Sequence, residues 1–159
     1  MVMRAVNYPL FVLTVLLALV ASIALFPTGL AHWRPEWLAM LVIYWVLRAP
    51  GRFGILTAWT LGLLLDVLEG SALGIHALSL SLVAALVLAA HQRLQMYPLP
   101  QQCLVVFLFV GLGQMLVHFV HQMLGIPRGG FEYLYPALSS ALVWPVFLVL
   151  MDGINRKLS

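Results

Sequence analysis

Long apolar runs, separated by short segments that contain Gly and Pro, occupy most of this chain. A helix needs about 20 such residues to cross the hydrocarbon core of a bilayer, and most of the runs approach or reach this length. Charged residues make up only 8% of the chain, whereas a soluble domain carries about 25%. We therefore expect a polytopic membrane protein. The pattern excludes a cytosolic enzyme and a disordered protein, and the single cysteine, Cys103, excludes an intramolecular disulfide.

Six apolar runs predict six transmembrane helices in one compact all-α bundle. The expected spans are 8–26, 35–49, 53–69, 72–90, 101–124 and 134–151, which makes residues 1–159 a single integral membrane domain. No length remains for a soluble catalytic or nucleotide-binding domain. Pro27, Gly29 and Trp33 follow the first run in place of a signal-peptidase pattern, so we expect this run to be retained as a span.

Two arrangements of the spans fit the Lys and Arg positions equally well. With six spans and a cytoplasmic N-terminus, only Arg34 and Arg128 lie outside the cell. The second run is short, and five spans without it, with the N-terminus outside, leave only Arg4 and Arg128 outside. We favour six spans with both termini in the cytoplasm, because the aromatic residues of the second run would be costly to leave in water. A short helix can be accommodated by burial among other helices.

Small residues recur at helical spacing along the third and fourth spans. Such faces let two backbones approach closely, so they predict packing of these spans against each other or against a partner helix. We expect Ser71 to cap the start of the fourth helix. The residues of these faces and of the connection between them are Gly54, Ala58, Gly62, Gly70, Gly74, Ala77, Ser81 and Ala85.

Five polar side chains are predicted at the outer side of the bundle. Asp66 is the acidic residue that falls inside a span, on the small-residue face of the third span, and His76 is near enough across the short turn to reach it. Gln114, His118 and His121 share one face of the fifth span. We expect these side chains to converge on a polar pocket, because polar groups inside a membrane require partners.

The sequence carries no signature of catalysis. A P-loop, a nucleophile elbow and a zinc-protease motif are all missing from it. The two histidines of the fifth span have no Cys, Asp or Glu at ligand spacing, so we expect no metal and no cofactor. The net charge of +3 indicates the excess of Lys and Arg that is usual in the loops of a membrane protein, and not a surface that binds nucleic acid. We therefore expect a protein that is not an enzyme.

The segment from Gly62 to His76, with Asp66, Gly70 and Gly74 at intervals of four, resembles the central signature of the MreD family of rod shape-determining membrane proteins. The loop motif Arg34, Pro35, Glu36 and Trp37 and the later stretch from Tyr44 to Leu47 are also similar to that family. The resemblance extends over essentially the whole chain.

The resemblance implies a multi-pass protein of the bacterial inner membrane. It implies a scaffold of the cell-elongation complex, required for rod shape and lateral peptidoglycan synthesis, with MreC as first partner and MreB, RodA and a class B penicillin-binding transpeptidase in the same complex. It also implies a fold similar to the substrate-binding subunits of vitamin (ECF-type) transporters. The alternative function is therefore a solute-binding transporter subunit with an outward-facing polar pocket.

Overall fold

A computed structural model of the protein describes residues 8–24, 33, 35–126, 130 and 134–158. Within these residues all regular secondary structure is helical. The helices are α1 (Tyr8–Ala24), α2 (Trp37–Arg48), α3 (Ile55–Glu69), α4 (Ile75–Met96), α5 (Leu99–Met123) and α6 (Tyr135–Leu158). The six helices correspond in order to the six predicted apolar runs.

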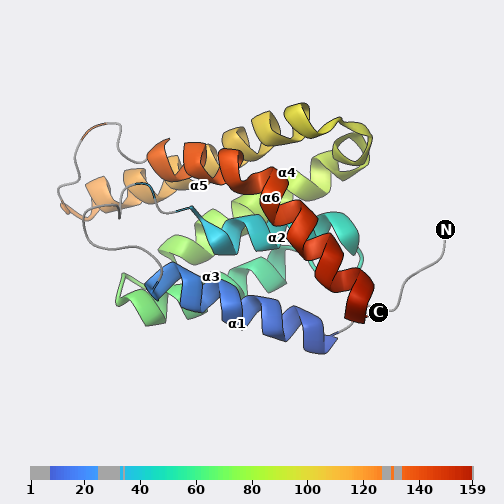
Figure 1. The fold of residues 1–159 in the computed structure, drawn as a ribbon. Helices are drawn as coiled ribbons and strands as arrows, with labels where there is room; N and C mark the ends of the chain where they lie inside the picture. Colours follow the sequence, from blue (N-terminus) through green and yellow to red (C-terminus); the bar gives the residue numbers. More distant parts are fainter. Residues whose placement is uncertain (1–7, 25–32, 34, 127–129, 131–133, 159) are drawn as a thin grey trace.

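Successive helices run in alternating directions through the bundle (Figure 1). As a result, α1 begins and α6 ends at the same end of the molecule (Figure 1). The most extensive helix–helix contact joins α3 to α4, followed by that between α5 and α6. Helix α1 lies at the periphery and packs mainly against α2.

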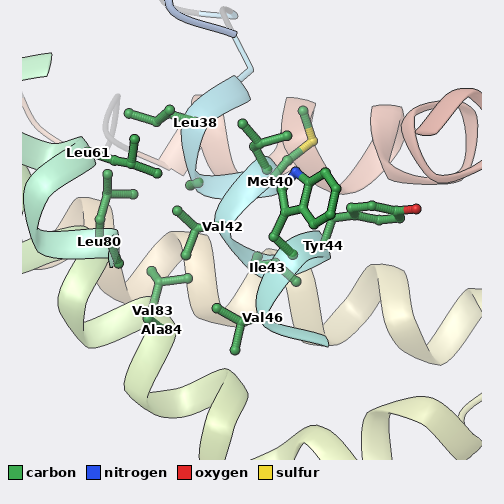
Figure 2. Packing of buried hydrophobic residues seen from close by; sticks show 14 of the residues in the cluster. Leu38, Met40, Val42, Ile43, Tyr44, Val46, Leu61, Leu80, Val83 and Ala84 are labelled. Carbon is green, nitrogen blue, oxygen red and sulfur yellow. The ribbon is translucent and has the colours of Figure 1, made fainter. Parts of the chain in front are cut away.

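Helix α2 occupies the centre of the bundle. Nine consecutive residues of this helix, from Leu38 to Val46, are buried, so that none of its sides is left uncovered. Figure 2 shows Leu61 of α3 and Leu80 and Val83 of α4 gathered around it, and all three belong to the same buried cluster. The 12-residue helix is only about 18 Å long at 1.5 Å per residue. Its neighbours shield it from lipid, as expected for a short span.

Three helices are long and apolar enough to span a membrane by themselves, namely α4, α5 and α6. Helices α1 and α2 are apolar but shorter, and α3 has 15 residues. The described residues therefore contain six helices of which three are clear spans, where the sequence predicts six. The similarity to transporter subunits stays a prediction.

Two helix ends differ from the predicted spans. Helix α4 begins at Ile75 and not at residue 72, because residues 70–74 fold around the Asp66 side chain. Helix α6 continues to Leu158, beyond the predicted end at 151. Cationic Arg156 and Lys157 stabilise its last turn, since positive charge is favourable at the C-terminal end of a helix.

The small-residue face of α3 lies directly against α4. A Cβ atom at Gly62 would come within 2.5 Å of the backbone nitrogen of Ala77, so only glycine allows this approach. Ala58 and Ala77 are both completely buried. Gly54 has a looser contact, with Leu88 Cδ1 at 3.8 Å from its Cβ position. Ser81 and Ala85 further along α4 are half-buried. Use of these faces by a partner helix stays a prediction.

Charged side chains are segregated between the two ends of the bundle. The end of the bundle where α1 begins is also where α2, α4 and α6 end and where α2 connects to α3 (Figure 1). We call it the basic end, because the five described Lys and Arg residues belong to these last turns and to this connection: Arg48, Arg52, Arg93, Arg156 and Lys157. The described acidic residues Glu36, Asp66 and Glu69 lie at the opposite end, which we call the Asp66 end, and Asp152 lies at the basic end.

Candidate functional site: the Asp66 turn

The carboxylate of Asp66, on the last turn of α3, is fully buried. Its Oδ1 atom accepts a hydrogen bond from Ser71 Oγ at 2.8 Å, and its Oδ2 atom accepts one from the Gly74 backbone N–H at 2.9 Å. The Ser71 N–H donates to the Asp66 backbone carbonyl at 3.1 Å. The connection between α3 and α4 is therefore folded around a single acidic residue.

Asp66 also caps the start of α4. Gly74, which precedes the helix, has no side chain for this purpose. Instead, the backbone N–H of His76 donates to Asp66 Oδ1 at 3.1 Å, in addition to the bond from Gly74. The carboxylate thus satisfies N–H groups that lack an intrahelical partner and lies at the positive end of the helix dipole. The prediction that Ser71 caps α4 is wrong, because its hydroxyl donates to Asp66.

The imidazole of His76 completes this arrangement. Its Nδ1 atom lies 2.7 Å from Asp66 Oδ1. An ionised carboxylate can only accept hydrogen bonds, so Nδ1 carries the proton in this contact. The Nε2 atom lies 3.7 Å from Glu69 Oε2, which places the ring between two carboxylates. The structure thus brings Asp66 and His76 into direct contact across the turn.

Two glycines permit the turn. Gly70 has φ of 68° and Gly74 has φ of 101°, both in the left-handed region. Residues that carry a Cβ atom rarely adopt these φ values. The four-residue spacing of Asp66, Gly70 and Gly74 therefore has a local explanation. Gly70 ends α3 in the left-handed conformation. Gly74 precedes α4 in the same conformation, and its N–H donates to the Asp66 carboxylate.

The polar residues of α5 make local contacts. The buried His121 ring places Nδ1 2.8 Å from the Val117 carbonyl, and His118 Nε2 lies 3.0 Å from Gln122 Nε2. Gln114 is half-buried. The alternating helix directions put the C-terminal half of α5 at the Asp66 end (Figure 1). Convergence of these three residues with Asp66 and His76 on one pocket stays a prediction.

The loop motif ties α2 to α6. Pro35 and Glu36 precede the first turn of α2, and the Glu36 N–H donates to Ser140 Oγ of α6 at 2.9 Å. The Nε1 atom of Trp37 is buried without a hydrogen-bond partner. Arg34 lies outside the described residues. This segment therefore fixes the start of the central helix to the last helix of the bundle.

A second polar cluster, at the basic end, was not predicted. Asp152 of α6 accepts hydrogen bonds at Oδ1 from Arg48 Nη2 at 2.5 Å and from the Tyr44 hydroxyl at 2.9 Å. The Arg48 guanidinium lies over the Tyr44 ring, 5.3 Å from its centroid. One feature of the sequence could have predicted the contact between Arg48 and Asp152. The two residues carry opposite charges and lie at the ends of spans that are expected on the same side of the membrane. Among the described residues, no group of His, Cys, Asp and Glu is arranged to hold a metal.

These features define a helical membrane-protein bundle whose buried polar groups join one helix to another. The family model described as rod shape-determining protein MreD matches residues 3–154. The Rod shape-determining protein MreD of Haemophilus influenzae is 34% identical over 141 residues, covering 89% of this chain and 87% of that protein. The chain belongs to the MreD family of rod shape-determining proteins. No solved structure matches it.

Proposed function

We propose that this protein is an inner-membrane scaffold of the bacterial cell-elongation complex, needed for rod shape and lateral peptidoglycan synthesis. The observation that carries the proposal is the match of the MreD family model to residues 3–154. The relative from Haemophilus influenzae bears a name that states a role in rod shape. The role is one of assembly and not of catalysis, with no cofactor.

The proposed arrangement is a single membrane domain of six crossings with both termini in the cytoplasm. Two observations support it: the helices alternate in direction (Figure 1), and the described Lys and Arg residues gather at the end where α1 begins. Positive residues are enriched on the cytoplasmic side of membrane proteins. The Asp66 end then faces the cell exterior, and a bundle similar to vitamin-transporter subunits is compatible with this order of helices.

The first partner in this proposal is MreC, with MreB, RodA and a class B penicillin-binding transpeptidase in the same complex. Helices that leave apolar sides uncovered support membrane-embedded association, since partner helices can replace lipid there. Peripheral helix α1 offers such a side, formed by Val12, Leu13, Leu16, Leu17, Val20 and Ile23, all of which are exposed.

Recovery of partners from native membranes tests this function. The protein, tagged at its C-terminus, is expressed at native level, solubilised in mild detergent and captured. We expect MreC to be enriched over an unrelated multi-pass protein carrying the same tag. Enrichment of a nucleotide-hydrolysing transport module in place of MreC would overturn the scaffold and support a solute-binding transporter subunit.

A further inference from the structure

A cavity of about 380 Å³ lies at the basic end of the bundle. Its walls come from α2, α4, α5 and α6 and consist of Tyr44, Leu47, Arg48, Leu94, Gln95, Gln102 and Leu148. Two other cavities in the described part of the bundle hold only about 10 Å³ each and have almost entirely apolar walls. Sites for small ligands have volumes of roughly 300–1,000 Å³, so the basic-end cavity is large enough for a ligand or part of one.

Arg48 supplies this cavity with an oriented cation. Its side chain is 48% exposed, and its guanidinium is held by Asp152 on one side and by the Tyr44 ring on the other. The bond to Asp152 uses one N–H of Nη2. A guanidinium has five N–H donors in a rigid planar fork, which matches the oxygens of a phosphate group. Further donors of Arg48 can therefore serve an anionic ligand.

The surroundings of the cavity are electropositive. Arg52, Arg93, Arg156 and Lys157 are exposed at the same end, and Asp152 is the acidic side chain that the described residues place there. Asp152 is itself paired with Arg48, so the field of the remaining cations favours a negatively charged ligand. Basic residues close to the cytoplasmic surface of a membrane attract anionic lipids in the same way.

The remaining walls are partly apolar. Leu47, Leu94 and Leu148 come from three different helices and adjoin the polar side chains of Arg48 and Gln95. Arg48 is the last residue of α2, and α4 and α6 end at the same end of the bundle (Figure 1). Helices α4 and α6 are long and apolar enough to span a membrane, and the ends of spanning helices lie near the lipid headgroups. A ligand with an anionic head and a non-polar body fits both kinds of wall.

We infer that this cavity binds the phosphate headgroup of an anionic phospholipid, with Arg48 contacting the phosphate and the leucine side chains contacting the glycerol and upper acyl region. The bound lipid would bridge α2, α4 and α6 at the basic end of the bundle. This inference does not depend on the scaffold function, because it rests on the cavity and its charges.

Lipid binding to the detergent-purified full-length protein tests the inference. Short-chain phosphatidylglycerol is titrated and the bound fraction is measured by native mass spectrometry, with phosphatidylcholine of the same chain length as the zwitterionic comparison. Both lipids carry the phosphate, but the choline ammonium cancels its charge and is repelled by the cations of the basic end. We therefore expect phosphatidylglycerol to bind about tenfold more tightly than phosphatidylcholine. Equal affinity for the two lipids would overturn the inference.

Two variants and a control locate the site. Arg48→Gln is expected to weaken phosphatidylglycerol binding about tenfold, whereas Arg93→Gln, which removes the same charge at the same end but outside the cavity walls, should change it less than about twofold. Leu148→Trp fills the cavity without altering charge and should also weaken binding. If Arg48→Gln fails to fold, the binding of phosphatidylglycerol to Leu148→Trp shows whether the lipid occupies the cavity. Equal loss in Arg48→Gln and Arg93→Gln, or unchanged binding in Leu148→Trp, would contradict the site.

Competition with inorganic phosphate tests whether the ligand is a phospholipid or a soluble phosphate. A phosphate ion offers the same oxygens but makes no use of the leucine walls. We therefore expect millimolar phosphate to leave phosphatidylglycerol binding nearly unchanged. Competition by phosphate at concentrations similar to those of the lipid would show a site for a soluble phosphate and would overturn the lipid assignment.

Discussion

At the scale of single residues, Asp66 shows how a buried charge can be retained in an apolar bundle. Its carboxylate receives hydrogen bonds from Ser71 Oγ and from the backbone N–H groups of Gly74 and His76, and it lies 2.7 Å from the imidazole of His76. Charge-assisted bonds of this kind offset the cost of removing a carboxylate from water. The residue therefore holds the end of α3 and the start of α4 together.

Substitution of Asp66 should destabilise the protein in a graded way. Asp66→Ala leaves the donors of Gly74, Ser71 and His76 without an acceptor, and loss of one partner from a buried charged network costs about 3–5 kcal/mol. Asp66→Asn keeps one acceptor oxygen and should cost less. Thermal unfolding in detergent measures the effect. We expect the melting temperature to fall from the wild type to Asp66→Asn and further to Asp66→Ala. The control Glu69→Gln, at an exposed position, should shift stability by no more than about 1 kcal/mol.

An Asp66→Ala variant as stable as the wild type would contradict the capping role. In that case the hydrogen bonds of the turn would not contribute to the stability of the bundle. A loss as large in Glu69→Gln as in Asp66→Ala would place the stabilisation on the imidazole and its two acidic neighbours together, and not on the cap.

At the scale of helices, close packing explains why α3 and α4 carry small residues. The Cβ position of Gly62 overlaps the backbone of α4 at Ala77, while that of Gly111 in α5 is at an ordinary distance of 3.8 Å from Ala137 Cβ. In lipid, helices associate through such packing and not through the hydrophobic effect. The two glycines lie inside helices and differ mainly in the space available to a methyl group.

Gly62→Ala should therefore separate α3 from α4. Forcing a methyl group into a close-packed contact costs about 1–3 kcal/mol, and backbone atoms cannot move aside as a side chain can. Gly111→Ala is the matched control, which should be neutral or stabilising by up to about 1 kcal/mol, because alanine is the better helix former. The melting temperatures of the two purified variants measure the difference. Equal melting temperatures would show that α3 and α4 have room for the methyl group.

The sequence predicts the presence of the six helices better than their ends. Apolar runs fix the helices, since each run must be covered by other helices or by lipid. The start of α4 depends on hydrogen bonds to the Asp66 side chain, and α6 continues into the polar residues that follow its apolar run, so hydropathy alone gives neither end. The bond from Arg48 to Asp152 joins residues more than a hundred positions apart, and no local pattern reports it. The Asp66–His76 contact is predictable because only a short turn separates the two residues.

The central position of α2 is harder to predict. A helix that is buried on every side has no polar face, so its sequence resembles that of a helix surrounded by lipid. Its length of 12 residues indicates only that it cannot cross a bilayer core of about 30 Å unaided. The packing of Leu38 to Val46 among the other helices resolves how such a short run is accommodated.

At the scale of the whole molecule, charge segregation is the basis of the proposal that the basic end of the bundle faces the cytoplasm. The described Lys and Arg residues lie at the end where α1 begins and α6 ends (Figure 1). Six crossings with a cytoplasmic N-terminus put Trp33 outside the cell and Tyr8 inside. Five crossings without α2 reverse both. Positions later in the chain, such as Leu73 and Met96, do not distinguish these arrangements.

Cysteine labelling in intact cells separates the two arrangements. Single cysteines are introduced at exposed positions in a Cys103→Ser background. We expect Trp33→Cys, like Leu73→Cys, to react with a membrane-impermeant maleimide in intact cells. We expect Tyr8→Cys, like Met96→Cys, to react only after permeabilisation. Leu73 and Met96 serve as outer and inner controls under both arrangements. Labelling of Tyr8→Cys but not of Trp33→Cys in intact cells would favour five crossings.

The central claim is that this membrane bundle maintains rod shape by assembling other proteins. Depletion of the protein in the bacterium that encodes it, followed by measurement of cell width under the microscope, tests this most directly. We expect depleted cells to widen and become round, and re-expression of the wild-type chain to restore rods. Cells that keep their width and rod shape after complete depletion would contradict the account.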